Sequence, residues 1–445
     1  MALQRSGAQT AAPKRRRPNV SAQTSAPKRP APCIFASRCF TENVPENVPE
    51  PLISSSNVAQ FRKGPGGRSS FSGNVVTVFG STGFTGLRVV NRLAKHGNQL
   101  ILPYRCDAYF VKELKVMCDL GQVLFFPFQL SDDESIRKAV KHSNIVINLI
   151  GTYIDTVNYS IYDTNVEGAG KIARICREMG VERLVHVSAM NADPSYKTRF
   201  IKNGAFLKSK GMGEQAVLAE FPNATIIRPS VLYGEFDRFI YPMLTRWRKN
   251  PLDMVYAFNL GNGIYKMPLF VNDFSNGVAK AAMDPTAAGR TYEFVGPHCY
   301  EMCELLDFIC MKGGLSREYS FEYRRIGIRE PWFLFMSFLC YTFTKLYRRP
   351  GFINWEWFDF VEATSDVLTG GGTLTLKDLG ITNLAEFEEA GGWHCMQLSF
   401  LKPYELDYDD YPHPPLPLRS PPLYKQKQTA FGARDVLTEQ RAFGL

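Results

Sequence analysis

Short runs of apolar, β-branched residues alternate with longer amphipathic segments over the first half of the chain. The runs have the composition of strands buried on both faces, and they comprise residues 74–79, 99–103, 123–128, 145–150, 184–187 and 225–227. The segments between them have the character of helices, and they include residues 87–96, 132–141, 165–179 and the region around 206–210. Strands that alternate with helices predict an α/β fold with a Rossmann-like, doubly wound parallel sheet.

A glycine-rich turn follows the first predicted strand directly. It consists of Gly80, Ser81, Thr82, Gly83, Phe84, Thr85 and Gly86. Glycines permit a tight turn and the close approach of a pyrophosphate, and the N-terminus of the following helix offers free N–H groups and a positive dipole end. The order of strand, turn and helix therefore predicts a dinucleotide-binding site, with a glycine-rich turn that binds nothing as the alternative.

The end of the second predicted strand indicates which dinucleotide is bound. Arg105 lies there, about 20 residues beyond the glycine turn, where the adenosine ribose is expected. An arginine favours the 2′-phosphate of NADP, whereas Asp107 could instead accept the ribose hydroxyls of NAD. Ligands of such sheets lie beyond the carboxyl ends of the strands, so the same crevice is expected to contain Leu149, Ile150, Gly151, Ser188, Pro229, Ser230 and Val231.

These motifs together resemble the atypical, extended short-chain dehydrogenases/reductases. The resemblance rests on GSTGFTG, the arginine after the second strand, NLIG (148–151), GVERLVHVS (180–188) and RPSVLYGEFDRF (228–239). A closer likeness is to a family of accessory subunits of mitochondrial NADH:ubiquinone oxidoreductase, complex I, and it rests on VTVFGSTGFTG (76–86), ILPYRCD (101–107), DLGQVLFF (119–126) and KHSNIVINLIG (141–151). This likeness covers about residues 67–300 and extends more loosely to about residue 390.

The resemblance implies a subunit that holds NADPH structurally and takes no part in electron transfer. Its partners would be other complex I subunits near the quinone-binding junction of the peripheral and membrane arms, in a hetero-oligomeric assembly. It would lie peripherally on the matrix side of the mitochondrial inner membrane. An active NADP-dependent reductase and a soluble nucleotide-sensing regulator are the alternatives.

The residues expected for reductase chemistry are incomplete. A short-chain reductase uses a Tyr hydroxyl as acid or base, a Lys four residues later that binds the nicotinamide ribose, and a Ser that orients the carbonyl. Lys210 and Ser188 match, but Phe206 occupies the Tyr position, and a phenyl ring transfers no proton. Tyr196 is nearby with the wrong spacing, so no catalytic residue is predicted. Gln129 stands where related sequences usually have an Asp near the adenine.

Composition and charge divide the chain further. Residues 1–55 are predicted to be a presequence and disordered linker, and residues 70–235 a nucleotide-binding domain with contributions up to about residue 300. Residues 236–400 are predicted to form a smaller α/β lobe that docks a partner or a membrane, and residues 401–445 a Pro-rich tail. No hydrophobic run reaches the ~20 residues needed to span a bilayer.

The formal net charge of +9 is concentrated in the first 40 residues. They contain 8 of the 52 Lys and Arg residues and no acid, which leaves 44 basic and 43 acidic residues in the rest. A nearly neutral body argues against nucleic-acid binding. The acid-free segment, rich in Arg, Ser and Ala, predicts a mitochondrial presequence. A nuclear-localisation or nucleic-acid patch at residues 14–17 and an unselected disordered tail are the alternatives.

The second half contains fewer signals. Residues 268–285 predict a strand and a helix, with Asp273 as the helix N-cap. Cys299, Cys303 and Cys310 have the spacing of one helix face, so no metal site is predicted. The ten cysteines form no CxxC pair, which indicates reduced thiols.

Two C-terminal segments are candidates for contact with a partner. Residues 331–343 are almost continuously apolar and aromatic, with cationic flanks, and are too short to span a membrane. They predict a helix on an anionic surface or under another subunit, with a buried core helix as the alternative. The Pro-rich residues 407–426 predict an extended arm that wraps a partner or is disordered.

Overall fold

A computed structural model gives the structure of the chain. It describes residues 63–64, 67–197, 204–247, 254–313, 324–327, 331, 334–335, 338–339, 342, 355–370, 373–398 and 414–425. The predicted presequence and most of the aromatic segment 331–343 lie outside the described residues.

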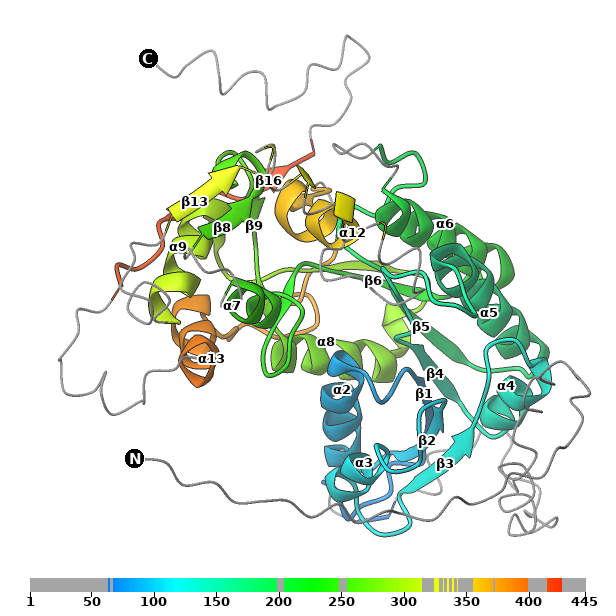
Figure 1. The fold of residues 1–445 in the computed structure, drawn as a ribbon. Helices are drawn as coiled ribbons and strands as arrows, with labels where there is room; N and C mark the ends of the chain where they lie inside the picture. Colours follow the sequence, from blue (N-terminus) through cyan, green and yellow to red (C-terminus); the bar gives the residue numbers. More distant parts are fainter. Residues whose placement is uncertain are drawn as a thin grey trace, which may run out of the picture. The chain divides into compact units, whose positions relative to one another are not determined.

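A seven-stranded parallel sheet forms the centre of the N-terminal half (Figure 1). Its strands, in spatial order, are β11 (Thr291–Phe294), β6 (Thr225–Pro229), β5 (Arg183–Val187), β4 (Ile145–Asn148), β1 (Val75–Phe79), β2 (Gln99–Tyr104) and β3 (Val123–Pro127). The strand order reverses between β1 and β4, and ligands of open α/β sheets bind beyond the strand ends at such a switch point. The predicted doubly wound sheet is confirmed, and β11 adds an edge strand from beyond residue 290.

Helices cover both faces of this sheet (Figure 1). One face packs against α2 (Phe84–Lys95), α3 (Lys112–Met117) and α8 (Val271–Met283). The other packs against α4 (Asp133–Val140), α5 (Gly168–Glu178) and α6 (Ala205–Glu220), and the π-helical turn η2 (Asp163–Glu167) leads into α5. Because the β-branched side chains of the central strands alternate between the two faces, each strand contributes to both apolar layers.

A second apolar core lies in the C-terminal lobe. Its large side chains come from three helical segments above all, α7 (Ile240–Trp247), α9 (Met302–Lys312) and η5 (Phe358–Ala363). The other elements of the later chain are β7 (Leu232–Tyr233), β8 (Met254–Ala257), η3 (Phe258–Gly261), β9 (Tyr265–Lys266), β10 (Leu269–Phe270), η4 (Pro285–Ala287), β12 (Cys299–Glu301), β13 (Arg324–Gly327), α12 (Trp355–Trp357), β14 (Val367–Leu368), η6 (Phe387–Gly391), α13 (Gly392–Gln397), β15 (Arg419–Ser420) and β16 (Leu423–Tyr424).

Two expectations for the later chain were wrong in part. Asp273 is not an N-cap: α8 begins at Val271 after Phe270, and the Asp273 carboxylate accepts from the Ala385 amide at 2.8 Å. Cys299 lies on β12, so only Cys303 and Cys310 lie on the helix α9.

The described part of the Pro-rich tail pairs with its own chain. β15 runs antiparallel to β12, and β16 runs parallel to β14. Of the aromatic segment 331–343, the described side chains are exposed, Phe338 to 66% and Phe335 to 56%. Among the described residues, no helix is both long enough and apolar enough to cross a membrane.

Candidate functional site

Glycines shape the turn between β1 and α2. Gly80 has a φ of +83°, a left-handed conformation that side chains rarely adopt. A Cβ at Gly86 would lie 2.2 Å from the Gly80 carbonyl oxygen, so only glycine fits there. Gly83 is the N-cap of α2, and no side chain bonds the first N–H groups of this helix. The turn therefore keeps a helix N-terminus available for an anion such as a phosphate.

Lys210 lies at the carboxyl ends of β4 and β5. Its Nζ donates to the Val187 carbonyl oxygen at 3.1 Å, and a Cβ at Gly151 would lie 2.6 Å from the same Nζ. Burial lowers the pKa of this ammonium to about 8, and the nearby Glu214 carboxylate opposes the shift. α6 thus holds a buried cation at the crevice that the strand ends form.

Two buried hydroxyls at the strand ends lack a partner. The Oγ atoms of Ser81, in the glycine turn, and of Ser188, after β5, make no hydrogen bond with any described residue. An unsatisfied buried hydroxyl costs free energy, which a ligand with polar groups would recover. The free helix N-terminus, the buried ammonium and these hydroxyls together fit a dinucleotide.

Arg105 marks the other end of the crevice, after β2. It is exposed, and its Cζ lies 5.6 Å from the centre of the Tyr159 ring. The Asp107 carboxylate accepts from the Tyr109 amide at 3.0 Å, in a local turn. The guanidinium is therefore exposed beside the ring, and one oxygen of the Asp107 carboxylate accepts a backbone hydrogen bond.

Comparison with known proteins places these features in a family. Residues 76–293 match the NAD dependent epimerase/dehydratase family. The mitochondrial NADH dehydrogenase (ubiquinone) 1 alpha subcomplex subunit 9 of Dictyostelium discoideum is 33% identical over 317 residues, which are 71% of this chain and 83% of that protein. The chain belongs to the family of this subunit 9.

Other members of the subunit 9 family match over a shorter region. The mouse protein of the same name is 44% identical over 247 residues, 55% of this chain and 63% of its own length. The 40 kDa subunit of the mitochondrial NADH-ubiquinone oxidoreductase of Neurospora crassa is 37% identical over 246 residues, 55% of this chain and 61% of its own length. The chain thus spans somewhat less than two thirds of these two relatives.

Solved structures support the fold alone. Epimerase Mth375 of Methanothermobacter thermautotrophicus aligns with a TM-score of 0.50 at 14% identity, over 73% of this chain and 91% of its own. The UDP-glucuronic acid 4-epimerase of Bacillus cereus gives a TM-score of 0.50 at 12% identity, over 73% of this chain and 99% of its own. Both are consistent with the Rossmann-like sheet described above.

Aromatic side chains surround Phe206 in the first turn of α6. Its ring centre lies 5.1 Å from that of Phe360 and 6.4 Å from that of Tyr153. The guanidinium of Arg238 lies over the ring of Tyr153, with its Cζ 5.0 Å from the ring centre. Because residues i and i+4 share a helix face, Phe206 lies one turn from Lys210 on α6. An aromatic ring packed among other rings therefore lies one helical turn from the buried ammonium.

Several residues singled out in the sequence form hydrogen bonds or packing contacts within the chain. The Ser230 hydroxyl donates to Asp366 Oδ2 at 2.5 Å, and Val231 packs in the C-terminal core. The Tyr196 hydroxyl bonds to the hydroxyl of Thr364 at 2.9 Å. Gln129 is bonded through its backbone to Ser135. Of these groups, the side chains of Ser230 and Val231 make contacts with the C-terminal part of the chain.

The other predicted residues lie at the expected places, at or beside the strand ends. Leu149 and Ile150 follow β4, and their backbone atoms lie 3.2–3.3 Å from a Cβ built on Gly80. Pro229 ends β6 and is buried. Thr82 is exposed, and Phe84 and Thr85 are half-buried in the first turn of α2.

Sequence reasoning missed two buried polar groups. The Asn165 side chain bonds both the amide and the carbonyl of Thr152 and the hydroxyl of Ser209, at 2.9–3.0 Å, and so fixes the loop after β4 to α6. Lys266 and Asp366 form an ion pair of 3.2 Å with at most 1% of either side chain exposed. Asn165 begins a predicted helix and Lys266 lies in a loosely patterned segment, so neither has a motif that marks it.

Among the described residues, no group of three His, Cys, Asp or Glu side chains could hold a metal ion.

Proposed function

We propose that this chain is a non-catalytic accessory subunit of mitochondrial complex I that binds NADPH as a structural ligand. The pyrophosphate would lie at the glycine turn and the N-terminus of α2, and the 2′-phosphate at Arg105. Lys210 would hold the nicotinamide ribose, and Ser188 would lie beside the nicotinamide at the end of β5. When bound, NADPH would supply a hydride donor. Reduction of a carbonyl substrate would also require a proton donor from this chain.

Phe206 is the observation that supports a role without turnover. Carbonyl reduction needs a proton donor beside the nicotinamide. The phenyl ring has none, and it packs against Phe360 and Tyr153. The lysine of the family pattern that holds the nicotinamide ribose is present, and the residue that transfers a proton is replaced.

A ligand that is bound without being consumed still has a thermodynamic effect. Binding to the folded state alone stabilises it by RT ln(1 + [L]/Kd), about 4 kcal/mol at a thousand times the dissociation constant. The orphaned hydroxyls and the buried ammonium make the empty cleft costly. NADPH would therefore act as part of the folded subunit.

The family supports the assembly part of the proposal. The relatives named above are subunits of a mitochondrial NADH dehydrogenase. We place this chain with other complex I subunits near the quinone-binding junction of the two arms, peripheral to the inner membrane on the matrix side, where it stabilises that junction and contributes to assembly. Nucleic acid is not among its proposed partners.

Native-gel separation of mitochondria and analysis of the purified full chain test the proposal. The chain should migrate with complex I, and alkaline extraction, which preserves the reduced nicotinamide, should release close to one NADPH per chain. Incubation with aldehydes and ketones should leave that NADPH unoxidised. Lys210→Met should lose most of the nucleotide, while Lys208→Met on the same helix should retain it. Turnover would support a reductase, and a soluble chain outside the complex would support a regulator.

A further inference from the structure

Tyr159 lies against Arg105, the residue proposed to recognise a 2′-phosphate. It belongs to the loop after β4, more than fifty residues from Arg105, yet the Arg105 Cζ lies 5.6 Å from its ring centre. Among the described residues Arg105 makes no ion pair. A guanidinium that stacks on a ring keeps its N–H edge free for a bidentate contact with an anion.

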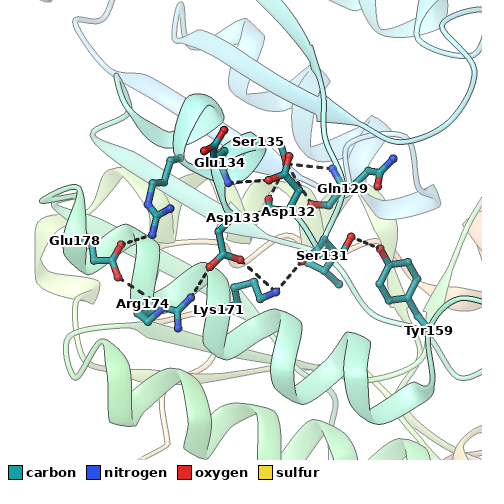
Figure 2. A network of polar contacts seen from close by, with 12 residues as sticks. Gln129, Ser131, Asp132, Asp133, Glu134, Ser135, Tyr159, Lys171, Arg174 and Glu178 are labelled. Carbon is teal, nitrogen blue, oxygen red and sulfur yellow. Dashed lines mark hydrogen bonds and ion pairs between the residues drawn. The ribbon is translucent and has the colours of Figure 1, made fainter. Parts of the chain in front are cut away.

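The ring of Tyr159 is itself held in place by its own loop. Its amide donates to the Thr156 hydroxyl oxygen at 3.1 Å, and its carbonyl oxygen accepts from the Thr156 amide at 2.9 Å. Its hydroxyl donates to Ser131 Oγ at 3.3 Å (Figure 2). Part of the ring packs against the apolar layer beneath α4 and α5. The side chain is therefore anchored at both ends.

Charged residues of α4 and α5 brace the anchor. Lys171 Nζ donates to the Leu130 carbonyl oxygen at 3.3 Å, next to Ser131, and pairs with Asp133 at 3.3 Å. Arg174 pairs with the same carboxylate at 2.7 Å (Figure 2). Contacts from α4 and α5 thus hold the segment around Ser131, which in turn bonds the Tyr159 hydroxyl. Arg105, in contrast, follows the end of β2, and its side chain is exposed.

We propose that Tyr159 is a positioning residue that sets the preference for a 2′-phosphorylated over an unphosphorylated dinucleotide by holding the Arg105 guanidinium over its ring. The inference rests on the proposed nucleotide function of the crevice. It adds a residue from the loop after β4 to the recognition of the ribose end. A purely structural Tyr159 would instead seal the apolar layer, and its loss would weaken every nucleotide equally.

The ratio of two dissociation constants separates these roles. Binding of NADPH and of NADH would be measured by calorimetry on the full chain after its nucleotide is removed, with wild type, Tyr159→Leu, Tyr159→Phe, Arg105→Ala and the Arg105→Ala/Tyr159→Leu double variant. Because both nucleotides are titrated into the same sample, a partly unfolded variant lowers both signals and leaves the ratio unchanged.

The expected pattern is specific. Tyr159→Phe should retain most of the wild-type preference for NADPH, because the ring is kept and only the 3.3 Å hydrogen bond to Ser131 is lost. Tyr159→Leu should reduce the preference about two- to fivefold, the value of an exposed cation–π contact. Arg105→Ala should reduce it about tenfold or more, and adding Tyr159→Leu should reduce it no further.

Two results would overturn the inference. Equal weakening of NADPH and NADH by Tyr159→Leu would assign the ring a structural role only. A further loss of preference in the double variant would show that the ring acts without Arg105. If wild type binds neither nucleotide, the proposed function fails as well, which distinguishes that failure from a failure of the Tyr159 inference alone.

Discussion

Burial gives the Lys210 ammonium a pKa of about 8, below the 10.5 of an ordinary lysine, and Glu214 offsets only part of this effect. The desolvated cation is useful at a site for an anionic ligand, because the electrostatic attraction is stronger away from water. It is a cost to the protein when the site is empty. The same residue therefore links nucleotide binding, stability and pH.

The sign of the pH dependence follows from this pKa. Between about pH 8 and pH 10.5 the unfolded chain keeps the Lys210 proton while the folded chain has lost it, so the contribution of this group to the free energy of unfolding rises with pH. From pH 7.5 to 9.5 the rise should be about 1–2 kcal/mol.

Urea unfolding of the nucleotide-free chain at both pH values measures this contribution. Lys210→Met should lack the rise, and the difference between wild type and variant isolates it from other titrating groups. Lys208→Met, two residues away on α6, should behave like wild type. An unchanged pH dependence in Lys210→Met would contradict the assignment.

At the scale of elements, the sequence predicts the helices and strands that have a pattern of apolar residues within their own segment. Each of the six predicted strands is present, because a short β-branched run that ends at glycine or polar residues is a strong local signal for a strand. The start of α2 was misplaced by three residues, since Phe84 and Thr85 resemble the turn and not the helix. Elements that depend on distant contacts were missed.

The segment 355–366 is the main element without a local signal. It contacts a part of the chain that is far away in sequence. The Glu356 carboxylate accepts from the Phe206 amide at 2.9 Å, in the first turn of α6, 150 residues earlier. No spacing within either segment predicts that pairing. The same holds for Asp273, whose carboxylate bonds Ala385 instead of capping its own helix.

This contact leads to a prediction for the first turn of α6. Glu356→Ala should raise the hydrogen-exchange rate of the Phe206 amide and lower the free energy of unfolding by about 1 kcal/mol, as for a lost helix cap. Glu356→Gln keeps a hydrogen-bond acceptor, so both the rise in the exchange rate and the loss of unfolding free energy should be much smaller. Exchange measured by NMR or mass spectrometry tests this, and equal exchange rates in both variants would argue against the cap.

At the scale of the whole molecule, buried polar contacts join the nucleotide-binding sheet to the C-terminal lobe. Asp366 accepts from Ser230, in the loop after β6, and from the Met267 amide, and it pairs with Lys266 on β9. Lys266 also donates to the Phe360 carbonyl oxygen at 2.9 Å. The segment that packs beside Phe206 is therefore fixed by the same cluster that holds the end of β6.

A double-mutant cycle on this pair is the test at that scale. Asp366→Asn leaves the Lys266 charge buried with one carbonyl partner and should cost about 3–5 kcal/mol. Lys266→Met should cost less, because Asp366 keeps two hydrogen-bond donors. The double variant should lose about 1–3 kcal/mol less than the sum.

The exposed pair Arg137–Glu178 provides the matched control for this cycle. Its atoms lie 3.1 Å apart with 43% and 40% of the side chains exposed, so solvent screens it. Its coupling should stay below about 1 kcal/mol in the same urea experiment. Additive losses at Lys266 and Asp366 would mean that the two side chains stabilise the molecule independently, and the buried pair would then not join the sheet to the C-terminal lobe.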